Sequence, residues 1–511
     1  MKNIRFKNKF STALFAMVLA TGVLSCRTDL LEPVPETAII DEFAFDTPAR
    51  ITLQSANLYT AMKNGAFLGG RVQVYGDVRA NDFLNRTTNG VTAYLVWQQT
   101  VTEASQNDVV NMWVFGYQAI NQINVFLDGM EENKSKFVLP KFAADYQSTT
   151  AQAYIAEARF LRAVAYHYLL QFYCRPFSSH ANTPDAGLPL RLNGEKGLDN
   201  NDLKRATVAE VYNQIIEDLN FAEANLPDTY GDALTRVTRA HKNSAIAFKT
   251  RVYLTKGDYA AVVTEANKLV PTAAPFAYTS ATRANHALQA NVANVFAVPQ
   301  ETSESIFSFP FTAQNPPGVQ NPLAFYFRAS GQGAPQAGGG EFSLNTGTGS
   351  IFADNTAWPA TDARRTSFTY TFGTARYLGK YPSGTPFLDK APVIRYAEVL
   401  LNLSEALART NAGVDARSLA LLNAVRTRST GAAGALAPAD NATLISNIMT
   451  ERRIEFLGEG LRNQDIMRLR DTFPSKGAVP AVGPTLPAWV WPIPVNELNA
   501  NNLAVQNPPQ G

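Results

Sequence analysis

The sequence predicts a mainly α-helical fold in which tetratricopeptide-like helical hairpins support a loop-rich cap with a few short strands. Three observations predict it: long stretches with apolar residues at steps of three and four, helix-capping signals, and a central stretch rich in Gly, Pro and aromatic residues that lacks helical periodicity. The chain has 511 residues, of which 46% are hydrophobic, so it can bury a large core.

Four cations open the chain, at Lys2, Arg5, Lys7 and Lys9. An uncharged, largely apolar run over residues 11–24 follows them, which is the layout of an export signal. A membrane-spanning helix requires about 20 apolar residues, so this shorter run predicts a leader that is cleaved and not a permanent span.

The leader ends in Val23-Leu24-Ser25-Cys26, which resembles the lipobox of bacterial lipoproteins. This resemblance implies that residues 1–25 are removed and that Cys26 becomes the acylated N-terminus. The alternative is an ordinary secretory signal with a chance cysteine. The polar, Pro-containing residues 26–45 then predict a tether between the lipid anchor and the folded body.

Cysteine content and net charge narrow the class of protein. If Cys26 is acylated, Cys174 has no intramolecular partner, so we expect no disulfide framework and a buried Cys174 thiol. The chain has 45 basic and 43 acidic residues, and removing the four leader cations leaves 41 basic residues and a formal charge of −2. A nucleic-acid-binding role therefore gains no support.

The body, residues 46–511, begins with a part that predicts packed helices, residues 46–270. Thr47 and Pro48 suit the N-cap and the first position of a helix. Thr207-Val-Ala-Glu210 is a capping box, followed by apolar residues at steps of three and four. We expect helices over residues 48–63, 107–130, 149–172, 208–226, 240–255 and 258–270.

The last two of these helices are hinged at Lys256-Gly257-Asp258 and look like a tetratricopeptide-type hairpin. A similar pair lies in the C-terminal part, residues 392–511, over residues 393–409 and 415–428, followed by a helix over 442–457. Such hairpins stack to bury shared faces. Between the two hairpins, residues 271–391 predict a loop-rich, ligand-facing cap that short strands and turns must organise.

Four segments form a recognisable set of motifs. They are Ala156-Glu-Ala-Arg-Phe-Leu-Arg-Ala163; Ile394-Arg-Tyr-Ala-Glu-Val-Leu-Leu-Asn402 with Glu405-Ala406; Glu451-Arg-Arg-Ile-Glu-Phe456 with Gly458, Glu459, Gly460, Arg462 and Asp465; and Trp491-Pro-Ile-Pro494. The terminal pattern continues through Glu497, Asn499 and Gln506-Asn507-Pro508. Together these segments resemble the SusD/RagB family of outer-membrane nutrient-uptake lipoproteins, and the resemblance spans nearly the whole mature chain.

The resemblance implies a SusD-like α/α superhelix anchored to the outer membrane and facing the cell exterior. It also implies a role as a lid on a SusC-like TonB-dependent transporter barrel, where the lipoprotein helps to capture a nutrient. Most characterised relatives bind glycans, and some of the RagB type handle peptides. We therefore expect a carbohydrate-binding protein, with peptide binding as the alternative.

Charged residues in the family motifs predict internal ion pairs. Glu157, Arg159 and Arg162 lie within two helical turns, and the stretch from Glu451 to Asp465 mixes both signs of charge. Such spacing suits i,i+3 pairs or pairs between helices better than catalysis. Trp113 and Tyr117, at i,i+4 spacing, and Trp489 and Trp491 near the terminus are expected in the core.

Candidate ligand contacts come from two regions that combine aromatic platforms with polar side chains, because the apolar faces of sugar rings stack on Trp or Tyr while hydroxyls pair with polar groups. The first region, residues 75–97, supplies Asp77, Arg79, Asn81, Asp82, Tyr94 and Trp97. The second, in the cap, supplies Tyr326, Arg328 and Trp358, although aromatics there could equally fasten the loops to the scaffold.

The sequence does not predict an enzyme. It contains no G-x-S-x-G elbow, P-loop, H-E-x-x-H or dinucleotide-binding glycine motif. The alternative is a surface glycoside hydrolase, which needs two carboxylates roughly 5 to 9.5 Å apart, and a pair formed across loops stays open. The four histidines are scattered, so no catalytic residue, transition-metal site or cofactor is predicted, and a structural calcium ion is left open.

Overall fold

The computed structural model describes residues 43–197 and 200–507, so Cys26, the predicted leader and most of the tether lie outside the described residues. The chain divides into a short unit that ends at Ile51 and a large unit that begins at Thr52. In the short unit, Thr47 Oγ1 accepts a hydrogen bond from the backbone N–H of Arg50 at 3.4 Å. Helix α2 (Pro48–Met62) therefore begins where the capping signal predicts.

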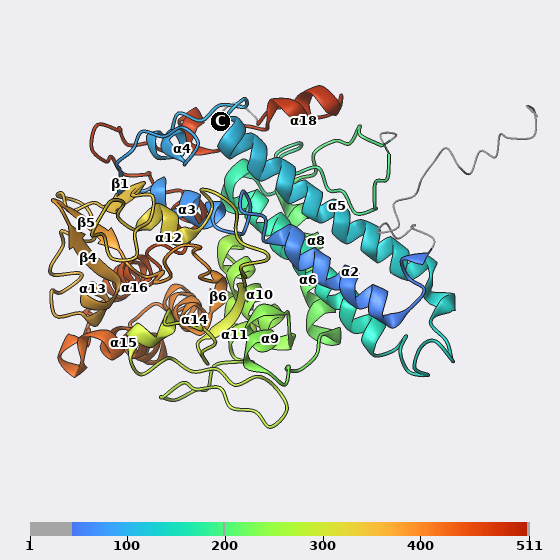
Figure 1. The fold of residues 1–511 in the computed structure, drawn as a ribbon. Coiled ribbons are helices and arrows are strands. Elements are labelled where there is room, and N and C mark those ends of the chain that lie inside the picture. The colour runs from blue at the N-terminus through green and yellow to red at the C-terminus, as the bar shows by residue number, and fades with distance from the viewer. Residues whose placement is uncertain (1–42, 198–199, 508–511) are drawn as a thin grey trace, which may run out of the picture. The chain divides into compact units, whose positions relative to one another are not determined.

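Helices dominate the large unit (Figure 1). The helices after α2 are α3 (Arg71–Val78), α4 (Tyr94–Gln98), α5 (Asn111–Glu132), α6 (Thr150–Tyr173), α7 (Phe177–His180), α8 (Val208–Asn225), α9 (Ala233–Thr238), α10 (Lys242–Lys256), α11 (Tyr259–Ala266), α12 (Leu323–Phe327), α13 (Ala363–Phe368), α14 (Tyr396–Thr410), α15 (Ala416–Thr430), α16 (Asn441–Glu455), α17 (Arg462–Leu469) and α18 (Val495–Ala500). A π-helical turn (Gln106–Val110) precedes α5.

The predicted helical hairpins form. Helices α10 and α11 pack together, as do α14 and α15, and α11 also packs against α14, so the two hairpins share a buried face. Gly257 ends α10 with φ of 82°, a left-handed conformation that glycine adopts without a steric cost. The capping box at Thr207 is present at the start of α8. The structure corrects predicted boundaries: residues 393–395 belong to a strand, so that helix begins at Tyr396, and the helix predicted over residues 258–270 ends at Ala266.

Short strands organise the cap, as predicted. The cap contains β2 (Ser305–Phe309), β3 (Phe342–Leu344), β4 (Thr369–Phe372) and β5 (Ala375–Leu378), while β1 (Phe83–Asn85) lies in the 75–97 region and β6 (Ala391–Arg395) begins at the last residue of the cap. They form three antiparallel pairs, β1 with β3, β2 with β6, and β4 with β5. Because β6 runs directly into α14, the pair β2–β6 joins the cap to the C-terminal hairpin.

The C-terminal segment is fastened to the centre of the core. Trp491 is 1% exposed, its ring lies 4.9 Å from the ring of Phe172, and its backbone N–H donates to the Phe172 carbonyl at 2.9 Å. Trp113 and Trp489 are also buried, which confirms their expected packing role. Cys174 is a buried free cysteine, and burial raises the pKa of its thiol to about 11.

A dense set of buried ion pairs connects β2, the cap and the C-terminal helices, and we call it the ion-pair network: Glu304, Asp362, Arg364, Lys380, Arg395, Arg428, Glu451, Glu455 and Glu459. At its centre, Arg395 Nη1 lies 2.6 Å from both Glu304 Oε1 and Glu455 Oε1, and its Nε lies 2.8 Å from Glu459 Oε2. The prediction that the charged motif is structural is confirmed.

The other predicted pairs also connect helices. Glu157 on α6 pairs with Arg239 at 2.7 Å, and Arg162 pairs with Asp218 on α8 at 2.8 Å. Among the described residues, no helix is both long enough and apolar enough to span a bilayer.

Candidate functional site

Four of the predicted ligand contacts are buried fasteners of the 75–97 region, so the structure corrects their assignment. Asp77 accepts a hydrogen bond from the backbone N–H of Gly460 at 3.0 Å, and Arg79 donates to Asn463 Oδ1 at 2.6 Å. In the same region, Asn81 donates to the Gly349 carbonyl at 2.8 Å, and Asp82 pairs with Arg453 at 2.6 Å. Each of the four side chains is at most 5% exposed, so none presents a surface to a ligand.

The three predicted contacts in the cap are also buried. Tyr326 and Trp358 are 0% and 1% exposed, and the Arg365 guanidinium lies 4.9 Å from the centre of the Trp358 ring. Arg328 donates to the carbonyls of Gln336 at 2.9 Å and Tyr381 at 3.0 Å. The structure therefore supports the alternative reading, in which these side chains hold the cap loops in place.

Tyr94 and Trp97 are the two candidates that reach the surface. They lie on α4 at i,i+3 spacing, both are half-buried, and their rings stack with centroids 6.2 Å apart and planes inclined by 16°. Ala93 and Gln99, with φ of 67° and 59°, bracket α4 in the left-handed conformation. These two residues limit α4 to five residues, and the short helix holds the two near-parallel rings next to each other; we call this ring pair the aromatic platform.

Hydrogen bonds at the ring edges fix this aromatic platform. Trp97 Nε1 donates to the Phe83 carbonyl at 2.9 Å, and Gln98 Nε2 lies 2.7 Å from Tyr94 Oη. Lys476 Nζ lies 5.8 Å from the centre of the Trp97 ring. The ring orientations are thus set before a ligand arrives.

Lys476 is a buried cation held by carbonyl groups. Its Nζ donates to the carbonyls of Val78 and Arg79 at 2.5 and 2.6 Å, and Lys476 is 2% exposed. Burial and the nearby Arg79 guanidinium hold the pKa of Lys476 well below its usual range.

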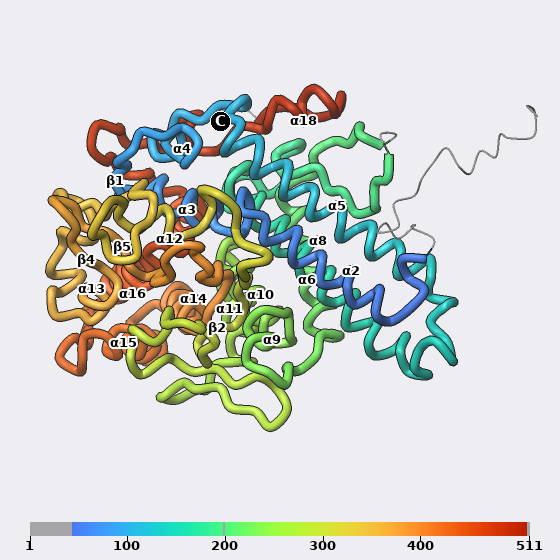
Figure 2. Tube along the Cα trace, in the orientation of Figure 1, coloured from blue at the N-terminus to red at the C-terminus, as the bar shows by residue number. Residues whose placement is uncertain are grey.

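The segment directly after α4 lines a groove of about 520 Å³, which we call the terminal groove. Figure 2 shows this part of the chain beside the C-terminal segment, and the backbone N–H of Val495 donates to the Glu103 carbonyl at 3.0 Å. The groove is lined by Thr100, Val101, Thr102, Glu103, Arg175, Pro487, Ala488, Val490, Pro492, Gln506 and Asn507.

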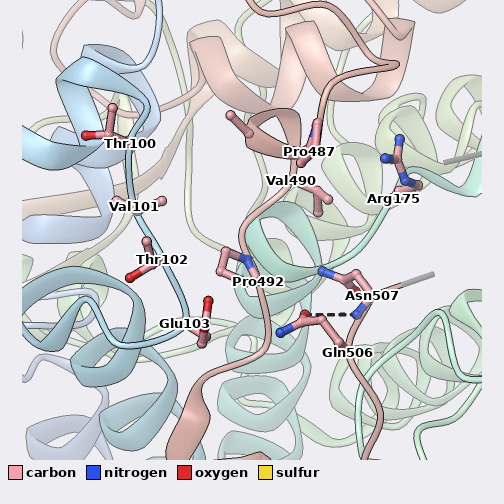
Figure 3. A pocket seen from close by; sticks show the side chains of 11 residues that line it. Thr100, Val101, Thr102, Glu103, Arg175, Pro487, Val490, Pro492, Gln506 and Asn507 are labelled. Atoms are coloured by element: carbon pink, nitrogen blue, oxygen red, sulfur yellow. Dashed lines mark hydrogen bonds between the residues drawn. The ribbon is translucent and has the colours of Figure 1, made fainter. Parts of the chain in front are cut away.

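Figure 3 shows how these side chains lie. The segment from Thr100 to Glu103 forms one side, Val490 and Pro492 lie in the middle, and Arg175 lies on the opposite side. This groove was not predicted from the sequence, because three distant segments build it. The one available signal was the unusual terminal pattern around Trp491 and Gln506.

Gln506 explains how the terminal segment is held. Its side-chain amide pairs with the backbone of Ile493, accepting from the N–H at 2.8 Å and donating to the carbonyl at 3.1 Å. Asn507 donates to the Trp491 carbonyl at 2.8 Å. No three His, Cys, Asp or Glu side chains of the described chain gather as a metal site would require.

Comparison with known proteins agrees with this architecture. Residues 31–254 match a family model described as starch-binding and associating with the outer membrane, and residues 355–509 match the model of the SusD family. A crystal structure of a SusD superfamily protein from Bacteroides fragilis is 31% identical, with a TM-score of 0.76 over 90% of this chain and 99% of that chain.

This chain belongs to the SusD family. Its mainly helical fold is the SusD fold, as predicted. The SusD-like protein P38 of Formosa agariphila is 23% identical over 99% of both chains. The surface glycan-binding protein A from Bacteroides fluxus shares the fold, with 20% identity and a TM-score of 0.68 over 90% of this chain and 99% of that chain.

Proposed function

We propose that this SusD-family protein is a lipid-anchored, non-enzymatic glycan-binding protein of the outer membrane that faces the cell exterior. It captures oligosaccharides and passes them to a SusC-like TonB-dependent transporter. Family membership and the glycan-binding relative support this role. The single observation that carries it is the surface pair of stacked rings, Tyr94 and Trp97.

Aromatic stacking suits a sugar ligand. The C–H faces of a pyranose ring are apolar, and they lose contact with water when they cover an indole or phenol ring. Because hydrogen bonds already fix both rings, little side-chain freedom remains to be lost on binding.

Glu455, in one of the family motifs, supports capture without chemistry. Burial alone would raise the pKa of Glu455, but Arg428, Arg395 and Arg364 outweigh burial and hold this pKa well below its usual range. A general acid requires a carboxyl that is protonated near neutral pH. Glu455 and its ion-paired neighbours are suited to structure instead.

The lipid anchor is tested by Cys26→Ser. Acyl chains contribute about 0.8 kcal/mol per buried methylene, so their loss should release the protein from the membrane fraction. The measurement is the share of protein in washed membranes, with Cys174→Ser as the matched control that should stay bound. Retention of the Cys26→Ser variant would refute the anchor.

The glycan proposal is tested by titrating the chain that starts after Cys26 with a panel of polysaccharides and oligosaccharides, with product analysis in the same tubes. Tyr94→Ala and Trp97→Ala should each weaken binding about tenfold, which is about 1.4 kcal/mol. Tyr259→Ala, which removes a half-buried tyrosine of α11, is the matched control and should bind as the unchanged protein does.

Tyr94→Ala is the cleaner of the two variants, because the Trp97 indole also donates a hydrogen bond to Phe83. Its thermal midpoint should stay close to that of the unchanged protein. Glycan turnover would overturn the non-enzymatic role. Undiminished binding by both variants would show that the glycan lies elsewhere.

A further inference from the structure

The terminal groove contains a buried arginine that has no carboxylate partner. Arg175 is 8% exposed, and its Nη1 donates to the Pro484 carbonyl at 2.8 Å. Its Nε is buried without a hydrogen-bond partner. Within residues 43–197 and 200–507, no acidic side chain forms an ion pair with it.

The surroundings of Arg175 leave its charge uncompensated. The nearby Arg470 is also a cation, and burial together with Arg470 lowers the pKa of Arg175. The other close partner is the Trp489 ring, whose centre lies 5.9 Å from the guanidinium. An uncompensated buried charge is costly, so protein sites of this kind favour a bound anion. A guanidinium N–H donates a short, charge-assisted hydrogen bond to a carboxylate.

The rest of the groove favours an aliphatic ligand. Its middle is formed by Val490 and Pro492, with Pro487, Ala488 and Val101 adding further apolar surface. The lining contains no aromatic ring on which a sugar could stack. The volume of about 520 Å³ lies in the range of sites for small ligands.

Polar groups on the far side complete the pattern. Thr100, Thr102 and Glu103 form the side opposite Arg175 (Figure 3). Their hydroxyl and carboxylate groups can bond the amide or ammonium N–H groups of a ligand whose carboxylate meets Arg175. A short peptide combines these features: a carboxylate, an aliphatic side chain beside it, and N–H groups a few atoms away.

We propose that the terminal groove is a second binding site, separate from the aromatic platform, which takes the C-terminal end of a short peptide. The peptide carboxylate binds Arg175, and the last aliphatic side chain packs on Val490 and Pro492. This site does not depend on glycan capture, since the platform and the groove are built from different side chains.

Calorimetric titration tests the proposal on the mature chain carrying Cys26→Ser. The probes are the tripeptide alanyl-valyl-leucine, its C-terminal amide, octanoate and galacturonate. We expect the free acid of the tripeptide to bind at least about tenfold more tightly than its amide. Octanoate and galacturonate, which each lack part of the pattern, should bind more weakly than the tripeptide.

Two arginine variants test whether Arg175 causes the tighter binding of the tripeptide acid. Arg175→Gln should abolish the difference between acid and amide, and Arg470→Gln, which removes the exposed neighbouring cation, should retain it. If Arg175→Gln fails to fold, the comparison of acid with amide on the protein that retains Arg175 still tests the proposal. Equal binding of acid and amide, no binding of the tripeptide, or tighter binding of octanoate or galacturonate would overturn the proposal.

The platform variant separates this result from the glycan proposal. Tyr94→Ala should leave binding of the tripeptide unchanged, and saturating glycan should not displace it. Displacement would show that the two ligands share one site and would overturn the second site.

Discussion

The ion-pair network and the face formed by α4 and the terminal groove both bury cations, but they compensate them differently. In the network, Arg395 meets three carboxylates at 2.6 to 2.8 Å. On the α4 face, Lys476 and Arg175 meet carbonyl oxygens and aromatic rings. The network thus uses opposite charges to join helices, whereas Lys476 and Arg175 have carbonyl oxygens in place of carboxylate partners.

The pKa values follow this difference. Burial alone would lower the pKa of Arg395, but Glu459, Glu455 and Glu304 outweigh it and raise the pKa well above its usual range. Arg79, beside the platform, has no such carboxylate, and burial lowers its pKa to about 9. A buried arginine therefore has several carboxylate partners in one region and none in the other. A bound anion can stabilise a buried cation most where that cation has no carboxylate partner.

The largest expected effect comes from breaking the network with Glu455→Gln. This change keeps the size of the side chain but removes the charge that compensates Arg395, Arg364 and Arg428. Removing one partner of a buried ion pair costs about 3–5 kcal/mol, so the free energy of unfolding should fall by about that amount. Urea denaturation measures it.

The matched control is Glu131→Gln. Glu131 pairs with Lys134 in the same chemistry, but the two side chains are 71% and 52% exposed. Exposed pairs contribute about 0–1 kcal/mol, so this variant should unfold almost as the unchanged protein does. Equal losses in the two variants would show that burial does not distinguish the network.

This contrast also explains what the sequence could predict. Local signals fixed the helices, because a capping box or a hinge glycine acts within one turn of its own residue. The sequence could predict that the charged motif forms ion pairs, since mixed charges at helical spacing suit pairing. Its partners were not, because Arg395 and Glu304 are 91 residues apart.

The site was harder to predict because ligand contacts and loop fasteners use the same residue types. Asp77 and Arg79 suit a sugar as well as they suit their actual partners, which lie 383 and 384 residues away. Tyr94 and Trp97 reach the surface because of left-handed residues at Ala93 and Gln99, and a non-glycine residue gives no sequence signal of that conformation.

The second prediction concerns the pH dependence of stability that buried acids cause. Burial raises the pKa of Asp108, in the π-helical turn, from 3.8 to about 7, and outweighs the Tyr75 hydroxyl and the Arg71 guanidinium, which favour the charged form. The folded state therefore binds a proton that the unfolded state has lost, and stability should fall as the pH rises from about 4 to about 7. Asp77, with a pKa also raised to about 7 by burial, contributes in the same window.

Asp108→Asn mimics the protonated acid and should remove its share of this pH dependence. We expect it to stabilise the protein at pH 8, relative to pH 5, by on the order of 2 kcal/mol. Denaturation at the two pH values measures the difference. An unchanged profile would place the titration elsewhere.

Asp465 gives the opposite sign and serves as the internal comparison. Burial alone would raise its pKa, but Arg452 and Arg468 outweigh burial and lower it to about 2. Its stabilising contribution is present above its unfolded pKa of about 4 and is lost as the pH falls towards 2. Asp108→Asn should leave this acid limb of the profile unchanged.

The smallest expected effect is that of salt, and it separates the two regions without a mutation. The network is buried, so raising the salt concentration from about 0.05 M to about 0.5 M should change the free energy of unfolding by less than about 0.5 kcal/mol. The terminal groove opens to solvent, so binding of the tripeptide acid at Arg175 should weaken by about threefold over the same range, while a neutral glycan should bind equally at both concentrations. Large salt sensitivity of unfolding would mean that water and ions reach the network, and the contrast between a compensated interior and an uncompensated binding face would fail.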